Sequence, residues 1–508
     1  MAAEGIKYEK LGETRLSFID VIAQTLGFMG PVFGSILLLV LVVGANFAGK
    51  GAGLASPDAI IVAAVGVGAL GWIIAQYAKR ISAAGALYEY ISEGFGDKAG
   101  FVFGWAYMGG LIVLAVAIPL LIGGVTADFL KQAYKIKIPY WVLGLAYTAI
   151  LFCVLYFGIK ISTRIQLTLV MVSATIVTIF LVYVIVKVGG GNSIKPFNPG
   201  SAHGVGNFFY GVLYAILLFV GFESAANLAE ETSEPKRYIP RAVLLSVAIV
   251  TVFFVVAAYA EAAGFGFNVH AWATSGAPLI VLALPKSQGG FGASWFFDVM
   301  NILLILDLTA VGIGASVAAT RLIFSLGRDR RIPGAFAAVS PRYGTPVVSI
   351  VLIVALAAAE ILINRATKGS FGFLGKVPAG GQEYFPFFAW LAGYGSLSLA
   401  VLYLGVSLSA VRGLWGKVNN AALGLAITVG VVITALAIYS AVYKVPSPFN
   451  AIWWVFLIWL AIGAIILLAL VSQGRWRLSA QAAGATGPAL AGPAPAGPAP
   501  AGPPLPGA

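Results

Sequence analysis

Two acidic residues, Glu223 and Asp307, lie deep inside long apolar stretches of the chain. Glu223 belongs to the stretch 207–229, and Asp307 lies near the middle of 292–320. An ionisable side chain within a membrane span is costly and is functional by default. Either carboxyl could carry a proton, and Asp307 together with Thr309 could coordinate Na⁺. The structural alternatives are that Glu223 hydrogen-bonds irregular backbone beside it and that Asp307 hydrogen-bonds a neighbouring helix.

Glycine and proline interrupt the apolar stretch 17–44 in its middle. The run 27–35 holds three glycines and one proline, and in a helix these cost roughly 1 kcal/mol for each glycine and about 3 kcal/mol for the proline. In lipid, the freed backbone groups must also find partners inside the protein. Unwound backbone at mid-membrane is where secondary transporters bind substrate and ions. We therefore expect a ligand to contact Gly30, Pro31, Val32, Phe33, Gly34 and Ser35.

A second irregular stretch, around Gly221, falls in the sixth of twelve apolar segments. These segments are 17–44, 59–78, 98–128, 139–157, 164–188, 207–229, 241–264, 292–320, 346–363, 385–410, 419–440 and 451–472. Breaks five segments apart predict two repeats of five helices, which are inverted because five is odd. The sequence thus predicts an all-α membrane protein of twelve transmembrane helices, with an inverted 5+5 repeat plus two extra helices.

The composition supports this class of protein. Of the 508 residues, 60% are hydrophobic and only 10% are charged, too few to cover the surface of a water-soluble protein, so the chain is expected to cross the lipid bilayer many times. The predicted regions are a cytoplasmic segment 1–16, a first repeat 17–188, a second, inverted repeat 207–410, two additional helices 419–472 and a disordered Ala/Pro/Gly tail 479–508.

The arginines are distributed unevenly between the two sides of the predicted membrane. With the N-terminus inside, thirteen arginines fall in inner segments and only Arg365 falls in an outer one. Such a bias sets orientation, so we expect a multi-pass protein of the cell membrane with both termini in the cytoplasm. The net charge of +12 then reflects topology, and no nucleic-acid partner is expected. Cys153, the lone cysteine, cannot form an internal disulfide.

Other classes of site are not expected. His203 and His270 fall in outer loops without metal-ligating neighbours, so we predict no metal site and no cofactor beyond a coupling H⁺ or Na⁺. The sequence has no Walker loop, so primary, ATP-driven transport is not expected and no ATPase partner is implied. It also shows no nucleophile–base pair of the kind that a membrane enzyme would need.

Three stretches carry a resemblance to a known family. They are 83–96 (AAGALYEYISEGFG), 219–241 (FVGFESAANLAEETSEPKRYIPR) and 321–333 (RLIFSLGRDRRIP), followed by the tetrapeptide YGTP at 343–346. In order and spacing they resemble the amino acid–polyamine–organocation (APC) superfamily of permeases, over about 17–410. The resemblance implies the leucine-transporter-like fold, with substrate held between spans one, three, six, eight and ten.

Two positions depart from the pattern of that family. Many members carry Gly-Ser-Gly in the first break, where this chain has a proline at position 31. Some members also carry a lysine in the fifth span, to which a proton-coupling role has been assigned. Counting from Gly158, the corresponding residue here is Ser173, so the role of that lysine cannot be transferred. The candidate coupling residues of this chain are Glu223, Asp307, Thr309 and Ser173.

An amino acid is a zwitterion and needs two kinds of partner. Free N–H groups at the start of a half-helix attract its carboxylate, and Gly34 and Ser35 are placed for this. Backbone carbonyls of 27–30 and of the sixth span could hold its ammonium. The alternative is that the glycines serve close helix packing. Further candidates for contact with the ligand, by gating or by lining the pocket, are Phe219, Gly221, Phe222, Tyr107 and Tyr394, with Phe33 as a third gate residue.

The sequence therefore predicts a secondary active transporter, a permease that takes up amino acids with H⁺ by alternating access. Two alternatives stay within transport: an exchanger of amino acids or polyamines, and a symporter coupled to Na⁺. A third, of another class, is a membrane amino acid sensor that has lost transport. The chain offers only short loops and its tail for the output domain that a sensor needs.

Overall fold

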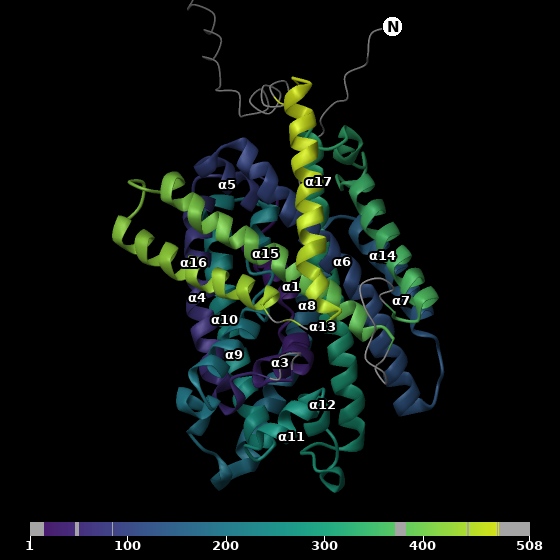
Figure 1. Cartoon of the computed structure of the whole chain (residues 1–508). Coiled ribbons are helices and arrows are strands. Elements are labelled where there is room, and N and C mark those ends of the chain that lie inside the picture. Colours follow the sequence, from purple (N-terminus) through teal and green to yellow (C-terminus); the bar gives the residue numbers. More distant parts are fainter. Residues whose placement is uncertain are drawn as a thin grey trace, which may run out of the picture.

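The computed structural model of the chain is a bundle of long helices (Figure 1). It describes residues 15–45, 50–83, 85–370, 383–443, 445, 447–474 and 476; the predicted tail 479–508 and most of the segment 1–16 lie outside them. The helices used below are α1 (Phe18–Met29), α2 (Pro31–Phe33), α3 (Leu39–Val43), α4 (Ser56–Ala78), α5 (Leu87–Phe95), α6 (Asp97–Tyr134), α7 (Tyr140–Tyr156), α8 (Ile159–Val188), α9 (Val205–Leu217), α10 (Pro235–Gly264), α13 (Ser294–Arg328), α14 (Val347–Thr367), α15 (Phe385–Gly413), α16 (Asn420–Val442) and α17 (Ile452–Ser472).

Ten helical segments of the described chain are long and apolar enough to cross a membrane. They coincide with ten of the twelve predicted spans. The other two predicted spans correspond to α7 and α9, which are apolar but shorter, at 17 and 13 residues. The helix α9 is short because the chain leaves helical geometry after Leu217. The count of twelve spans stays a prediction, whereas the all-helical membrane architecture is what the structure shows.

The first predicted span is two helical pieces rather than one helix. Ser17 caps α1 by a capping box with Asp20, in which each side chain bonds the backbone of the other, an arrangement that satisfies N–H groups at a helix start. The helix ends at Gly30, whose φ of 55° and ψ of 68° are left-handed. Pro31 then begins the next piece, a position where its missing N–H does no harm. The second piece continues through a π-helical turn, Gly34–Leu38, into α3.

The broken helices lie at the centre of the bundle. The helix α1 packs against α8, α10 and α13 and against the turn η6 (Ser224–Leu228), which follows the break after α9. In Figure 1, α1, α8 and α13 are central, and α16 and α17 lie outside them. In the described chain, 11% of the residues in the most apolar stretch of α17 are buried, as expected of a helix that faces lipid.

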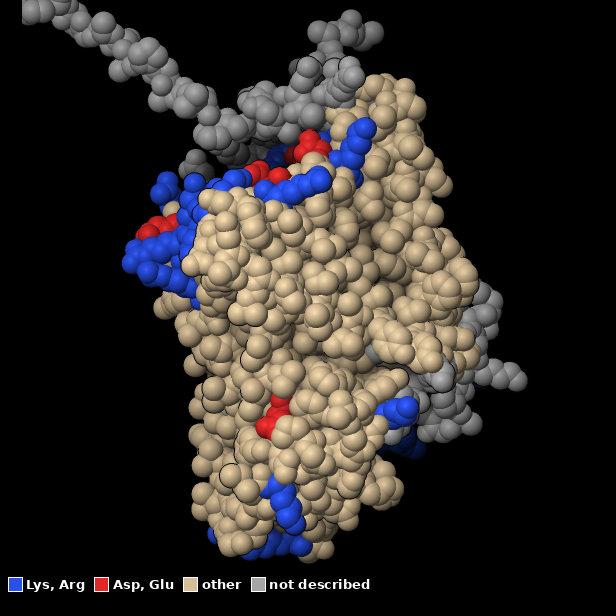
Figure 2. Space-filling view, turned by 60° about the vertical axis from the view of Figure 1, so that its left-hand side comes forward, with Lys and Arg blue, Asp and Glu red and all other residues tan. Residues whose placement is uncertain are grey.

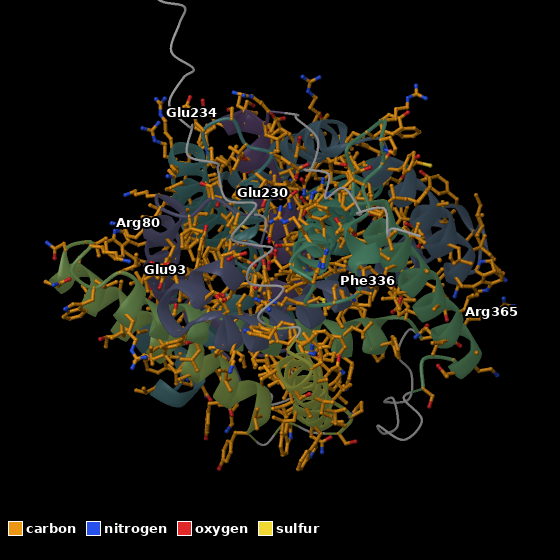
Figure 3. All side chains as sticks on the ribbon, turned by 90° about the horizontal axis from the view of Figure 1, so that it is seen from above. Arg80, Glu93, Glu230, Glu234, Phe336 and Arg365 are labelled. Carbon is orange, nitrogen blue, oxygen red and sulfur yellow. The ribbon has the colours of Figure 1, made fainter. Side chains whose placement is uncertain are left out.

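A broad band with few charges separates a group of basic side chains at the lower end of Figure 2 from basic and acidic side chains gathered at its upper end. We call this end the charged face and define it by Glu89, Glu230, Glu231, Arg328 and Arg331. Seen from above, Glu230 lies towards the middle of the bundle, whereas Arg80 and Glu93 lie nearer its margin (Figure 3). Leu16 and Trp476, near the two ends of the described chain, both contact residues of this face.

Ion pairs hold the charged face together. Arg321 and Glu231 form a pair at 3.1 Å in which both side chains are almost fully buried, at 1% and 2% exposure. Arg328 donates to both carboxylate oxygens of Glu230, at 2.7 and 2.8 Å. At the start of the described chain, the N–H of Leu16 donates to the carbonyl of Glu231 at 2.8 Å. These contacts join the entry to α1, the segment after the second break and the end of α13.

The chain end after α17 is anchored to the same face. The guanidinium of Arg331 stacks over the ring of Trp476 at 3.5 Å from its centroid, a favourable cation–π geometry. The Trp476 ring also meets Phe101 at the start of α6, edge to face at 5.9 Å. The two ends of the described chain therefore lie on one side of the bundle.

The pKa values of two acids at this end of the bundle, Glu89 and Asp329, are raised. Burial, together with the negative charge of Asp329, raises the pKa of Glu89 to about 8. Burial likewise raises the pKa of Asp329 to about 6, although Arg328 and Arg331 oppose the shift. A raised pKa in the folded state means that these acids favour the fold most at low pH and that this contribution is lost as the pH rises towards 8.

We expect the change Arg321→Met to destabilise the protein strongly. It keeps much of the side-chain volume but leaves Glu231 buried without its cation, which typically costs about 3–5 kcal/mol. The melting temperature in detergent should fall markedly. The control is Arg237→Met, which breaks an exposed pair with Glu234 and should change stability by less than about 1 kcal/mol. Equal melting shifts in the two variants would contradict a structural role for the buried pair.

Candidate functional site

The break at Gly30 is held by the carboxylate of Asp307. The backbone N–H of Phe33 donates to Asp307 Oδ2 at 2.7 Å. A Cβ atom on Gly30 would lie 2.3 Å from Val311 and 3.3 Å from the same carboxylate oxygen, at a φ that disfavours side chains. Glycine is therefore required at this position, both for its left-handed geometry and for the close approach of α13.

A third helix reaches the same carboxylate. The hydroxyl of Ser173, on α8, lies 3.3 Å from Asp307 Oδ1, and both side chains are fully buried. Asp307 thus connects α13, the short helix α2 and α8. Thr309 does not join this group: its hydroxyl donates to the carbonyl of Ile305, and its own carbonyl accepts from Tyr147 on α7.

The second break is built around Gly221 and packs against the first. Gly221 has a φ of 104°, and a Cβ there would lie 2.7 Å from the ring of Phe28 at the end of α1. Two residues on, Glu223 accepts a hydrogen bond from the hydroxyl of Tyr403 on α15 at 2.7 Å. Glu223 is fully buried. Each break therefore carries one buried carboxyl at or beside it, bonded to a different neighbouring helix.

Buried amide and hydroxyl groups join the two breaks to their surroundings. Ser224 donates to the carbonyl of Gln24 at 3.3 Å, which connects the segment after the second break to α1. The amide of Gln24 donates to the carbonyl of Gly314 on α13 at 2.9 Å. Asn227 donates to the hydroxyl of Tyr107 on α6 at 3.0 Å. The pieces of both broken helices on the side of the charged face are thus tied to α6 and α13.

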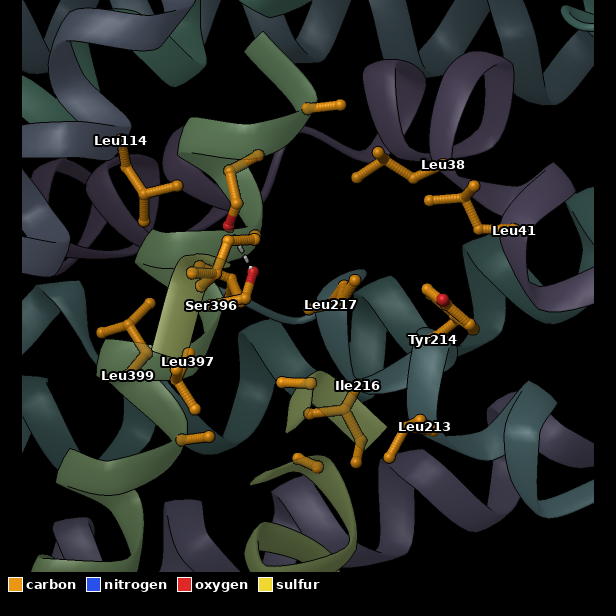
Figure 4. Close-up of a pocket in the computed structure, with 18 of the residues that line it drawn as sticks. Leu38, Leu41, Leu114, Leu213, Tyr214, Ile216, Leu217, Ser396, Leu397 and Leu399 are labelled. Carbon is orange, nitrogen blue, oxygen red and sulfur yellow. Dashed lines mark hydrogen bonds between the residues drawn. The ribbon is translucent and has the colours of Figure 1, made fainter. Parts of the chain in front are cut away.

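A cavity of ≈ 540 Å³ opens beside the breaks. Phe28, Met29 and Phe33 line it at the first break. Its walls come from α3, α9, α15 and α16 (Figure 4). The volume is in the range of small-molecule sites, and most of the lining side chains are apolar. The residues labelled in the close-up are Leu38, Leu41, Leu114, Leu213, Tyr214, Ile216, Leu217, Ser396, Leu397 and Leu399.

Of the predicted substrate-binding residues, Phe33 lies in the lining of this cavity. The rest of the first break, at Gly30, Pro31, Val32, Gly34 and Ser35, is buried behind it. Three predicted aromatic gate residues contact different partners: Phe33 meets Phe388, Phe219 meets Phe254, and Phe222 meets Tyr403.

The two predicted pocket tyrosines also lie outside the lining. Tyr107 is fully buried and accepts the hydrogen bond of Asn227. Tyr394 packs on α15 against Trp390 and Phe456, in a cluster that includes the outer helix α17.

Sequence reasoning missed Tyr403, Asn227, Gln24 and Gln166. Tyr403 is nine residues after Tyr394, the predicted pocket tyrosine of the same span, and lies on the opposite side of the helix. Gln166, on α8, donates to the carbonyl of Ala310 at 2.9 Å. Uncharged amides within apolar spans are a signal that could have been used, because such groups need internal partners in lipid.

Known proteins with similar sequences are transporters. The branched-chain amino acid permease BcaP of Bacillus subtilis is 24% identical over 348 residues, covering 64% of this chain and 70% of that protein. The low-affinity putrescine importer PlaP of Escherichia coli is 26% identical over 307 residues, covering 58% and 65%. The methylthioribose transporter of Bacillus subtilis is 22% identical over 445 residues, covering 84% and 88%.

The fold is also that of a solved transporter. A crystal structure of a variant of the manganese transporter of Eremococcus coleocola superimposes with a TM-score of 0.56 at 14% sequence identity, over 92% of this chain and 97% of that one. The amino acid permease family model matches residues 25–478, a range that takes in both breaks, the cavity and the charged face. The chain belongs to the amino acid permease family.

Proposed function

We propose that this protein is a secondary transporter that moves a small amino acid or amine across the cell membrane by alternating access, coupled to H⁺. The observation that carries the proposal is the break at Gly30, where Asp307 accepts from the N–H of Phe33 at 2.7 Å beside a cavity of ≈ 540 Å³. Mid-membrane breaks of this kind are where secondary transporters bind their substrates.

The cavity and the charged face lie at opposite ends of the broken helix. The chain enters α1 at the charged face, where Leu16 bonds Glu231. The cavity is lined by Leu38, Leu41 and Ala45, at the far end of the same span. With the charged face in the cytoplasm, we interpret this arrangement as an outward-facing state in which the ion pairs close the inner side. Opening the inner side would require these ion pairs to separate.

An inverted 5+5 repeat gives this arrangement a mechanism. The breaks fall in the first and sixth predicted spans, the corresponding helices of the two halves, and α16 and α17 follow the second half. With α7 and α9 counted as spans, the chain crosses the membrane twelve times. In repeats of this kind, one bundle rocks against the other around a fixed central site.

The surroundings of Asp307 favour H⁺ over Na⁺ as the coupling ion. A hard cation needs several oxygen ligands. One of the bonded neighbours of Asp307 is an N–H donor, on Phe33, and the hydroxyl of Thr309 is directed to its own helix. A carboxyl that exchanges a proton needs no such ligand set. Glu223, bonded to Tyr403, is the second candidate carrier.

The coupling proposal is tested in proteoliposomes with the variants Glu223→Gln and Asp307→Asn. Each keeps the side-chain shape but cannot release a proton. The variant that lacks the carrier should lose uphill uptake driven by a pH gradient, down to the level of protein-free vesicles, and keep counterflow, which needs no gradient. A Na⁺ gradient alone should drive no uptake in the wild type. Uphill uptake with unaltered pH and Na⁺ dependence in both variants would remove both residues from coupling.

A second prediction concerns the contact between the two breaks. We expect Gly221→Ala to weaken substrate binding about tenfold, since a left-handed alanine costs roughly 1–2 kcal/mol and its methyl group would press on Phe28. Gly206→Ala in α9 is the matched control, because a Cβ there meets open space. Binding to purified protein measures the effect. Wild-type affinity in the Gly221 variant would show that this packing does not shape the site.

A third prediction concerns orientation. In a Cys153→Ala background, Ile194→Cys, at a side chain that is 81% exposed, should react with an impermeant maleimide in intact cells, because its loop is predicted outside. Lys79→Cys, at an exposed position that is predicted to be cytoplasmic, should react only after permeabilisation. The reverse pattern would invert the proposed topology.

A further inference from the structure

We infer that the solute is an amine with an apolar body and no carboxylate, rather than a free amino acid. This inference rests on the transport function proposed above and narrows its substrate. It comes from the groups that surround the first break and from the lining of the cavity beside it.

The start of the second helical piece offers little to a carboxylate. Pro31 has no N–H to donate, and the N–H of Phe33 is already taken by Asp307. The N–H of Gly34 and the hydroxyl of Ser35 bond carbonyls of their own helical piece. The donors that would hold the carboxylate of an amino acid are therefore engaged within the protein. The negative charge that suits a helix start is supplied by an acidic side chain.

The cavity itself offers no cation. The described residues that line it include no lysine, arginine or histidine. Of the four hydroxyl groups in the described lining, those of Ser396, Tyr403 and Thr434 already donate within the protein, and the fourth, on Tyr214, is a neutral donor. A carboxylate that entered would lose its water without gaining a charged partner, and burying an unpaired charge is strongly unfavourable.

The same place suits a single ammonium group. The helix α1 ends beside the cavity at Met29, and the last carbonyls of a helix carry partial negative charge. Behind the lining residues Phe33 and Tyr403 stand the acids Asp307 and Glu223, each hydrogen-bonded to the residue in front of it. The surrounding leucine and phenylalanine side chains fit an apolar body. A diamine that placed one ammonium at the break would leave the other among the apolar side chains further along the cavity, where the described lining includes no acid.

The test compares ligands that share one carbon skeleton. Binding to the purified full-length protein, and uptake into proteoliposomes, are measured for 3-methylbutylamine, leucine methyl ester, leucine and putrescine. The amine and the ester keep the ammonium and lack the carboxylate charge. We expect both to bind at least about 100-fold more tightly than leucine, because the carboxylate of leucine would be buried without a charged partner. The pair phenethylamine and phenylalanine repeats the comparison with an aromatic body.

The outcomes separate this inference from the transport function. If leucine binds as tightly as the amine, the solute carries its carboxylate and the inference fails, while transport stands. If putrescine is preferred, the restriction to one ammonium group fails. If no ligand of the panel is bound or carried, the proposed transport function fails as well.

Two variants test the role of the acid at the break. Asp307→Asn keeps an acceptor for Phe33, removes the negative charge and adds an amide donor, so the preference for the amine over leucine should fall about tenfold or more. The control is Asp298→Asn. Asp298 lies near the start of the same helix, α13, and accepts a hydrogen bond from Tyr134, so this change should leave the preference unchanged. Pro31→Ala, which restores an N–H, should shift the preference in the same direction. An unchanged ratio in both the Asp307 and Pro31 variants would overturn the inference.

Discussion

The structure depends on keeping a broken helix inside an environment that tolerates no unpaired backbone. A helix that stops at Gly30 and restarts at Pro31 leaves carbonyls on one side of the break and N–H groups on the other. Lipid offers no water to satisfy them. Asp307, by accepting from Phe33, is the internal substitute for water at the N–H side. Because Asp307 comes from α13 and also meets Ser173 of α8, the break fixes where three elements of the core must lie.

The two breaks are packed as one unit. Gly221 lies against Phe28 so closely that a methyl group would not fit, and Ser224 bonds the carbonyl of Gln24. From there the chain continues directly to Glu231, which pairs with Arg321 at the charged face. A rearrangement of the second break therefore has a short covalent route to the buried ion pair. This connection gives a physical reason for a change at the ligand site to alter the closure of the charged face.

The sequence predicts the framework better than the site. Apolar runs and glycine with proline are local signals, so ten of the twelve spans, both breaks and the acids at the breaks, Glu223 and Asp307, follow from reading along the chain. The direction of a side chain on a helix that is apolar all round is not a local signal. For this reason the sequence predicts that Tyr394 lines the pocket, whereas the described lining contains Tyr403, which also meets Glu223. For the same reason the sequence groups Thr309 with Asp307, two residues before it, although the hydroxyl of Thr309 donates to Ile305 on its own helix.

The proline in the first break is the departure with the widest consequence. A glycine at position 31 would offer its backbone N–H to an anionic ligand, whereas Pro31 has no N–H to offer. The neighbouring N–H of Phe33 then serves an internal acid, and the same acid is a candidate proton carrier. Coupling and selectivity would in that case depend on one side chain.

Protonating Asp307 removes the negative charge behind the site of the ammonium, so proton binding and amine binding oppose one another. Such opposition is the thermodynamic pattern of exchange, whereas H⁺ symport requires the proton to favour the loaded carrier. If Asp307 is the carrier, the amine and the proton compete for the same negative charge, and H⁺ would leave as the amine enters; if Glu223 carries the proton, Asp307 keeps its charge throughout the cycle and symport remains open.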